Sequence, residues 1–267
     1  MKNAIVALTR GYPQDKNLYT NLIKRNISIY KHINSKREIS CDIILFHEGN
    51  ISSSDQTYIK NESPEEIKFV DVSKYLPIKH LNYIDIEKFN LGYRFMCRFN
   101  MFHIWKEVKE YDYILRIDED IKIQKFNSNL FEDMYKSNTI FTTGRFAKEL
   151  HKYTNQTLPT FISKNTKLDI NKIYNHKFPY TNVFATKVSF WLEKDIQELL
   201  STIAMSDEQL IYRWGDLPVL GGVLNSKNIK IKLFKKSRYV HISHDNLVIV
   251  NNFIRNLTIN SSLNPIK

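Results

Sequence analysis

The stretch that decides the fold is Tyr111–Ile123, with the sequence YDYILRIDEDIKI. Its first part, Tyr113–Ile117, is a short apolar run, which is typical of a buried strand. The run leads directly into Asp118-Glu119-Asp120. If the chain stays extended here, Asp118 and Asp120 point to one face of the strand and Glu119 points to the other. The sequence therefore predicts a buried strand that ends in a pair of acidic side chains.

The acidic pair raises the question of what neutralises it. Two neighbouring carboxylates repel each other, so Asp118 and Asp120 need a cation nearby. Hard oxygen ligands suit Mg²⁺ or Mn²⁺, and such ions keep coordination positions open for substrate phosphates. Because the Asp-x-Asp spacing also occurs by chance in solvated loops, this spacing leaves both interpretations open.

The first half of the chain alternates between strand and helix patterns. Apolar runs predict strands over 4–9, 41–46 and 67–72, and helical faces cover 18–33 and 92–109. This alternation indicates βαβ units and a mostly parallel sheet, so the fold class is α/β. Ligands of such sheets bind outside the carboxyl ends of the strands. Three segments fall at such ends, namely Arg10, the loop 47–49 and 118–120.

The second half is less regular. We expect strands over 139–146, 181–190, 229–234 and 239–246, and helices over 192–204 and 219–224. Pro218 disfavours a helical conformation at Leu217, so Asp216 is expected at a turn before the second helix. A simpler interpretation is that Asp216 is an N-cap carboxylate of that helix.

Composition limits the classes of function. The chain has 267 residues, 42% of them hydrophobic, and a net charge of +11. Such a charge suits nucleic acid, an anionic membrane or phosphorylated substrates, but the lysines are scattered and form no basic block. We therefore expect a solvated basic surface and no nucleic-acid partner. Both cysteines, Cys41 and Cys97, lie beside apolar segments and are expected to be buried free thiols.

Membrane and targeting signals are not visible in the sequence. The apolar part of the N-terminus is too short for a signal peptide, and no stretch is long enough to span a membrane. The expectation is a cytoplasmic or otherwise soluble chain.

Three further stretches carry a family resemblance. They are Gly92–Phe99 (GYRFMCRF), Leu115–Ile123 (LRIDEDIKI) and Tyr212–Val219 (YRWGDLPV). In this order they resemble the fungal-type α-1,2-mannosyltransferases of glycosyltransferase family 15, over residues 4 to about 246. The resemblance implies a GT-A fold with a Rossmann-like sheet, a GDP-mannose donor, a Mn²⁺ (or Mg²⁺) ion, a glycan acceptor and retention of configuration. It also implies one domain over 1–267, with a nucleotide-sugar-binding half (1–123), an acceptor-binding half (124–250) and a tail (251–267).

The resemblance also suggests roles for single residues. Asp118 occupies the metal-binding position, Asp120 contributes directly or through water, and His244 completes the metal site, with His241 as the second choice. The residues expected at the nucleotide-sugar donor are Arg10, Tyr93, Arg98 and Asp120. Asp216 is expected to face the acceptor as a catalytic residue beside Asp118, and Trp214 could stack on a sugar. The alternative is that Asp216 caps the following helix and Trp214 packs in the core.

The chain departs from the family in two places. Asp118-Glu119-Asp120 replaces a Glu-Pro-Asp-like motif, which leaves the donor sugar and base open. The family's glutamate, once proposed as a nucleophile, falls on Asn182-Val183-Phe184, which has no carboxylate. The departure favours a same-face mechanism over a covalent glycosyl-enzyme. The relatives carry an N-terminal Golgi membrane anchor, and this chain shows none.

Two other classes of function remain open at this point. A metal-dependent phosphodiesterase or nuclease could use Asp118, Asp120 and His244, although it would need further acidic ligands. A sugar- or nucleotide-binding module without catalysis would explain the missing glutamate.

Overall fold

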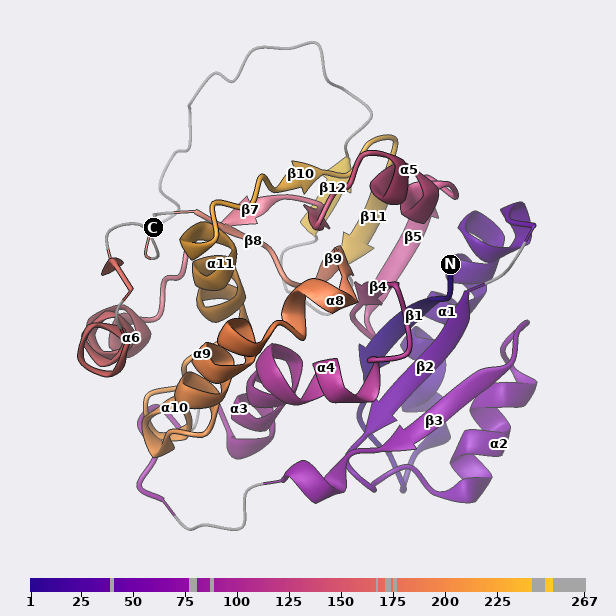
Figure 1. The fold of residues 1–267 in the computed structure, drawn as a ribbon. Helices are drawn as coiled ribbons and strands as arrows, with labels where there is room; N and C mark the ends of the chain where they lie inside the picture. The colour runs from indigo at the N-terminus through magenta and orange to yellow at the C-terminus, as the bar shows by residue number, and fades with distance from the viewer. Residues whose placement is uncertain are drawn as a thin grey trace.

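A central sheet of seven strands forms the middle of the molecule, with helices on both faces (Figure 1). The computed structural model describes residues 1–38, 41–76, 81–86, 89–166, 168–170, 174, 177–241 and 248–251. The strand order is β10-β6-β9-β4-β1-β2-β3. β9 runs antiparallel to both of its neighbours and the other strand pairs are parallel. The mostly parallel sheet confirms the α/β class.

The strands of this sheet have the following bounds: β1 (Asn3–Leu8), β2 (Asp42–His47), β3 (Ile67–Asp71), β4 (Tyr113–Ile117), β6 (Phe141–Thr143), β9 (Val183–Lys187) and β10 (Lys232–Leu233). The four expected strands of the first half are confirmed. They are continuously apolar because successive side chains enter two different cores. Ala4 and Ile114 pack into the core on one face, whereas Ile5 and Leu115 pack into the core on the other.

The helices of the first half are α1 (Thr20–His32), α2 (Ser53–Asn61), α3 (Leu91–Arg98) and α4 (Ile104–Glu107), with short 3₁₀ turns η1 (Lys16–Tyr19), η2 (Asn34–Lys36) and η3 (Ser73–Tyr75). The helix expected over 92–109 is interrupted by a π-helical turn, η4 (Phe99–His103). Such a turn holds one residue more than an α-helical turn. α3 begins at the N-cap Asn90, whose side chain accepts a hydrogen bond from the backbone N–H of Tyr93 at 3.0 Å.

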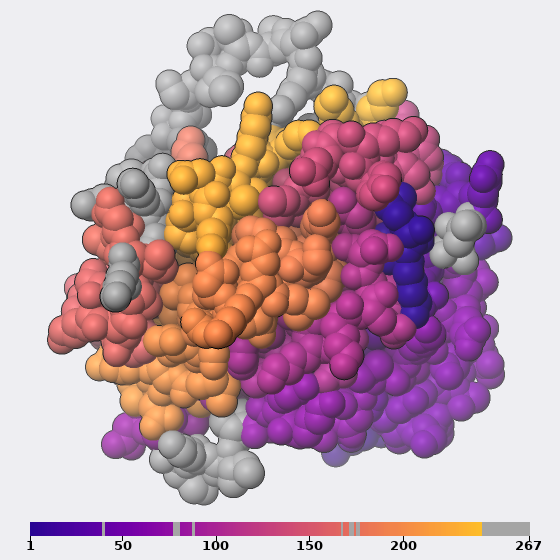
Figure 2. All heavy atoms as spheres, in the orientation of Figure 1, coloured from indigo at the N-terminus to yellow at the C-terminus, as the bar shows by residue number. Residues whose placement is uncertain are grey.

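The second half contains α5 (Leu130–Lys136), α6 (Lys152–Asn165), α8 (Val188–Trp191), α9 (Lys194–Ala204), α10 (Asp207–Ile211) and α11 (Asp216–Ser226). The strand expected over 181–190 is wrong at its end, because the chain turns into α8 after Lys187. This helix lets the buried Trp191 ring stack on Trp105, with the ring centroids 4.7 Å apart. In Figure 2 the orange atoms of this region lie directly against the magenta atoms of α3 and α4.

Two other expectations change in this half. The strand expected over 139–146 is divided into β6 and β7 (Phe146–Ala147), and β7 pairs with β8 (Phe178–Pro179). α11 begins at Asp216, earlier than expected, because Pro218 lies in the first turn, where its missing N–H is not needed.

A second, three-stranded antiparallel sheet is built from β5 (Ile121–Lys125), β11 (Arg238–His241) and β12 (Val248–Asn251). β11 covers the start of the strand expected over 239–246, and the rest of that segment up to residue 247 lies outside the described residues, as does 252–267 of the expected tail. The strand expected over 229–234 is reduced to β10. No helix in the described part of the chain is long and apolar enough to cross a membrane. Cys41 and Cys97 are buried free thiols, as expected.

Candidate active site

The acidic motif lies at the carboxyl end of β4, but it is a turn and not the end of an extended strand. The backbone N–H of Ile121 donates to the carbonyl oxygen of Asp118 at 3.2 Å, which closes the turn between β4 and β5. The expectation of an extended backbone over 118–120 is therefore wrong. The two carboxylates still lie close enough for the charge of Asp120 to raise the pKa of Asp118.

Glu119 fastens this turn to the end of β1. One of its carboxylate oxygens accepts hydrogen bonds from the Thr9 hydroxyl at 2.7 Å and from the backbone N–H of Arg10 at 3.0 Å. The other accepts from Nε of Arg10 at 2.9 Å. The Arg10 side chain is 73% exposed, so most of it faces solvent beside the turn. The structure thus brings Arg10 to the edge where Asp118 lies, as expected.

A buried arginine connects two of the expected catalytic residues. Arg116, the second-last residue of β4, contacts one oxygen of Asp118 through Nε at 3.0 Å and Nη2 at 2.8 Å. Its Nη1 donates to Asp216 at 2.5 Å. Burial raises the pKa of Asp118 to about 6; Arg116 opposes this rise, and the charges of Asp120 and Asp216 add to it. One cation thus serves two carboxylates in a poorly hydrated place.

Sequence reasoning did not single out Arg116, although it lies inside the opening motif. The available signal was a charged residue within the apolar run of β4. Such a residue is buried on both sides and requires a partner of opposite charge.

The second sheet brings a histidine to the motif. In the register of β5 and β11, Ile121 lies opposite His241, so Asp120 and His241 are neighbours. Nε2 of His241 lies 3.0 Å from a carboxylate oxygen of Asp120. His241 was the second choice for the metal site, and the first choice, His244, lies outside the described residues.

The donor atoms of Asp118, Asp120 and His241 are of the kinds that bind a divalent cation. Asp118 and Asp120 supply oxygen donors and His241 supplies a nitrogen donor, a set that suits Mn²⁺. Burial and the charge of Asp120 both disfavour the ionised form of Asp118, so a cation bound here would stabilise that form. Within the described ranges, no three His, Cys, Asp or Glu side chains are already gathered as a metal site.

Asp216 is the first residue of α11, and its carboxylate turns towards β4. The N-cap of α11 is Gly215, and no side-chain cap hydrogen bond is made there. The N-cap interpretation of Asp216 is therefore not what the structure shows. Trp214 is 1% exposed, donates from Nε1 to the Thr157 hydroxyl at 2.8 Å and packs on Phe161. Trp214 is a core residue, so its expected stacking on a sugar is wrong.

Tyr93 lies on the Asp216 side of the site. Its hydroxyl accepts a hydrogen bond from Nη2 of Arg213 at 2.8 Å, and Arg213 also lies 3.3 Å from a carboxylate oxygen of Glu149. Burial raises the pKa of Tyr93, and the charge of Asp216 contributes to this rise. Arg213 has a φ of 57°, a left-handed conformation that is uncommon for a residue with a side chain. This turn ends α10 and directs the chain into α11.

Arg98 is placed differently from the expectation. Its Nε donates to Oε1 of Gln209 at 2.9 Å and its Nη2 donates to the carbonyl oxygen of Ser206 at 3.1 Å. Burial lowers its pKa to about 10. These contacts tie α3 to the start of α10, and neither of them joins Arg98 to Asp118 or Arg10.

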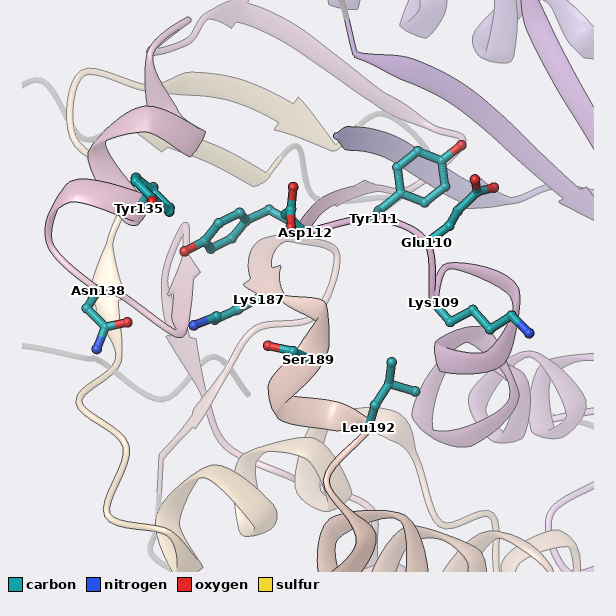
Figure 3. Close-up of a pocket in the computed structure, with 10 residues that line it drawn as sticks. Lys109, Glu110, Tyr111, Asp112, Tyr135, Asn138, Lys187, Ser189 and Leu192 are labelled. Carbon is teal, nitrogen blue, oxygen red and sulfur yellow. The ribbon is translucent and has the colours of Figure 1, made fainter. Parts of the chain in front are cut away.

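The structure also contains a pocket at the opposite edge of the sheet, at the amino end of β4 (Figure 3). It has a volume of about 270 Å³ and is lined by side chains that include Lys109, Asp112, Tyr135 and Lys187. None of the expected site residues lines it.

The fold is that of the GT-A-like glycosyltransferases. Among solved structures, the chain is similar to core-mannan synthase A (CmsA/Ktr4) from Aspergillus fumigatus in a Mn/GDP form, with a TM-score of 0.73, 17% identity and coverage of 91% of this chain and 75% of that one. It is also similar to the mannosyltransferase Ktr4p from S. cerevisiae in complex with GDP, with a TM-score of 0.71, 15% identity and coverage of 89% and 70%. Mouse xyloside xylosyltransferase 1 is more distant, with a TM-score of 0.53, 11% identity and coverage of 88% and 86%.

The resemblance to fungal mannosyltransferases that three sequence motifs indicated is thus confirmed at the level of the fold. No protein-family model matches the chain, and no curated protein matches it by sequence.

Proposed function

We propose that the protein is a metal-dependent, retaining glycosyltransferase that moves mannose from GDP-mannose to a hydroxyl of a glycan. The observation that carries this proposal is the Asp118–Arg116–Asp216 network at the carboxyl edge of a GT-A-like sheet, in which Arg116 and Asp216 are buried and Asp118 is 28% exposed. It joins a carboxylate suited to a metal–diphosphate complex to one suited to an acceptor hydroxyl. The two Ktr4-type structures, one with Mn and GDP and one with GDP, support the choice of metal and base.

Asp118 and Asp120, with His241 or His244, would hold the metal, and Arg10 would approach the diphosphate from the end of β1. When bound, Mn²⁺ would neutralise charge on the leaving diphosphate. Arg10 is suited to the same task because a guanidinium makes charge-assisted hydrogen bonds to phosphate oxygens. Glu119 orients Arg10 by accepting hydrogen bonds from the backbone N–H and from the Nε of Arg10.

Asp216 would accept a hydrogen bond from the acceptor hydroxyl and orient it towards the anomeric carbon. Arg116 positions this carboxylate, since its Nη1 contacts Asp216 directly. At 182–184, where a nucleophile would be sought, Phe184 is 1% exposed and stacks on Phe141, with the ring centroids 5.0 Å apart. A same-face transfer, in which the leaving diphosphate takes the acceptor proton, suits this arrangement. The α-1,2 linkage rests on the family resemblance.

The test is calorimetry and turnover with GDP-mannose, UDP-sugars and CMP-sugars, each with and without Mn²⁺. Mn²⁺-dependent binding of GDP and release of mannose from GDP-mannose are expected. Asp216→Asn keeps the shape of the side chain, and transfer to an acceptor should fall about 100-fold or more while donor binding persists. Binding of UDP in place of GDP would change the assignment of the donor's base but leave the protein a glycosyltransferase. Binding of no nucleotide would refute the proposal.

A second function, a sugar- or nucleotide-binding module, is favoured by the apolar Phe184 at the place of the family's glutamate. It predicts Mn²⁺-assisted binding of GDP-mannose with neither transfer nor hydrolysis. The same turnover assay separates it from the enzyme.

A further inference from the structure

Asn182 is a buried polar residue at the edge of the candidate site. It is 4% exposed, and neither Nδ2 nor Oδ1 of its side chain has a hydrogen-bond partner among the described residues. Burying an amide without partners is unfavourable, because its hydrogen bonds to water are lost and not replaced. A native structure retains such a group where it has a use, for example in binding a ligand.

The strand register gives the direction of the Asn182 side chain. β4 and β9 are antiparallel, with Arg116 opposite Phe184 and Ile117 opposite Val183. The backbone N–H of Asp118 donates to the carbonyl oxygen of Asn182 at 3.0 Å, which continues this pairing by one residue. Residues that lie opposite each other project to the same face, with Cβ atoms about 5 Å apart. Asn182 therefore projects beside Asp118, on the face where Arg116 and Asp216 meet.

Three more polar side chains come from segments at this end of β9, and with Asn182 they form what we call the Asn182 cluster. Arg145 follows β6, which pairs with β9, Tyr180 lies two residues before Asn182, and Tyr239 has its hydroxyl against Gly144. The Arg145 guanidinium lies over the Tyr180 ring, 4.3 Å from its centroid. The Tyr239 hydroxyl is buried and has no hydrogen-bond partner in the described chain. Because the carbonyl oxygen of Asn182 accepts a hydrogen bond from the backbone N–H of Asp118, the cluster adjoins Asp118.

A glycine makes room for the Tyr239 hydroxyl. A Cβ atom added to Gly144 would lie 1.8 Å from this oxygen, which is far closer than two such atoms can approach. Gly144 follows β6 directly and precedes Arg145 in the chain. The backbone at this point is therefore compatible with the hydroxyl only without a side chain.

We propose that the Asn182 cluster binds the hydroxyl groups of the hexose carried by the nucleotide donor. This inference rests on the proposed function, and it assigns the residues that bind the sugar of the donor. An amide offers two N–H donors and a carbonyl acceptor, a guanidinium offers donors, and a phenol offers both roles. A sugar ring with neighbouring hydroxyls can satisfy these groups, whereas a diphosphate offers acceptors and no donor for Oδ1 of Asn182.

The order of the strands favours the donor sugar over the acceptor. Along the sheet, Arg10 follows β1, Asp118 follows β4, Asn182 precedes the antiparallel β9, and Arg145 comes shortly after β6. A donor with its nucleotide at β1 and its diphosphate at Asp118 would extend its sugar along this line to Asn182. Asp216 comes instead from α11, on the face of the sheet, and is suited to the acceptor.

The test compares the affinity for GDP-mannose with the affinity for GDP, both with Mn²⁺, by calorimetry. In the wild-type protein GDP-mannose should bind more tightly than GDP. Asn182→Leu removes both unpaired atoms and keeps the size, so it should leave GDP affinity and melting temperature unchanged or raised. It should reduce the preference for GDP-mannose by about ten- to a hundredfold, because hydrogen bonds to the sugar are lost. Tyr239→Phe, which removes the hydroxyl alone, should reduce it in the same direction.

Asn100→Leu is the matched control. Asn100 is 2% exposed, also lacks hydrogen-bond partners for both side-chain atoms within the described residues, and lies in η4 against α9 and α11. This variant should keep the wild-type preference for GDP-mannose. If Asn182→Leu and Tyr239→Phe both fold and keep the full preference, the cluster does not read the sugar, and the proposed function stands. If the wild-type protein binds neither ligand, the proposed function and this assignment both fall.

Discussion

The two edges of the central sheet hold similar charged groups in different surroundings. At the amino edge, Lys2 contacts Glu110 and Asp112, and the side chains of Lys2 and Glu110 are 48% and 58% exposed. At the carboxyl edge, Arg116 joins Asp118 to Asp216 with its own side chain only 4% exposed. Water screens the first set, so its ion pairs contribute little, whereas the second set depends on its protein partners. Loss of hydration, more than the number of charges, distinguishes the carboxyl edge, where we propose the active site.

The largest expected difference between the edges is in catalysis. Asp118→Ala should reduce Mn²⁺-dependent turnover roughly a thousandfold or more, because it removes a carboxylate that we propose as a metal ligand. Glu110→Ala, at the amino edge, should leave turnover unchanged. Turnover of GDP-mannose measures both, with circular dichroism to establish that each variant is folded. Equal activity of the two variants would refute the distinction between the edges.

The next difference is in stability. Arg116→Met should lower the free energy of unfolding by about 3–5 kcal/mol, because it leaves the buried Asp216 and the partly buried Asp118 without their shared cation. Lys2→Met should lower it by less than about 1 kcal/mol. Urea unfolding of the metal-free protein measures both. Adding Asp216→Asn to Arg116→Met should restore part of the loss, and a loss that stays the same would show that charge repulsion is not its cause.

A smaller effect concerns alkaline pH at the amino edge. The Tyr111 hydroxyl donates to Asp42 at 2.7 Å. Burial, with Asp42 next in importance, raises the pKa of Tyr111 to about 12. The unfolded chain loses this proton near pH 10, so the stabilisation is complete below about pH 10 and is lost as the pH rises towards 12. Tyr111→Phe should flatten the fall in melting temperature over this range, and an identical fall in both proteins would contradict the assignment.

The smallest effect is expected at the pocket in Figure 3. Tyr135 lines it and is 64% exposed. Tyr135→Ala should change the free energy of unfolding by no more than about 0.5 kcal/mol, as for most surface substitutions. Calorimetry with Mn²⁺ and GDP should give the wild-type affinity. Weaker nucleotide binding would instead show that this pocket affects the candidate active site, and it would contradict the distinction between the two edges.

Part of this fold was predictable because its signals are local. The runs that form β1 to β4 are short, continuously apolar and separated by helical patterns. Parallel strands, and the positions of their carboxyl ends, could therefore be inferred from the sequence. The position of Asp118 followed from them. By contrast, α6 was not predicted, since its apolar residues are few and Pro159 lies inside it.

The partners in the site were less predictable because they are set by packing between distant segments. Asp120 meets His241 through the register of β5 and β11, and no spacing in the sequence encodes that register. Trp214 was expected at a sugar, but the direction of its ring depends on α6, which supplies Thr157 and Phe161. Arg98 lies in the stretch Gly92–Phe99, which resembles the family. That stretch could not show that the Arg98 guanidinium donates its hydrogen bond to Gln209.

The π-helical turn over Phe99–His103 makes the length of its helix as important as its composition. An α-helix advances about 100° per residue, so one additional residue changes the phase between α3 and α4 by that angle. With this phase, Tyr93 reaches Arg213 at one end while Trp105 stacks on Trp191 at the other. A homologue one residue shorter here could not keep both contacts with an uninterrupted α-helix. A one-residue gap in an alignment of this region therefore matters more than a substitution, because the loss of one residue would reorient a whole helical face.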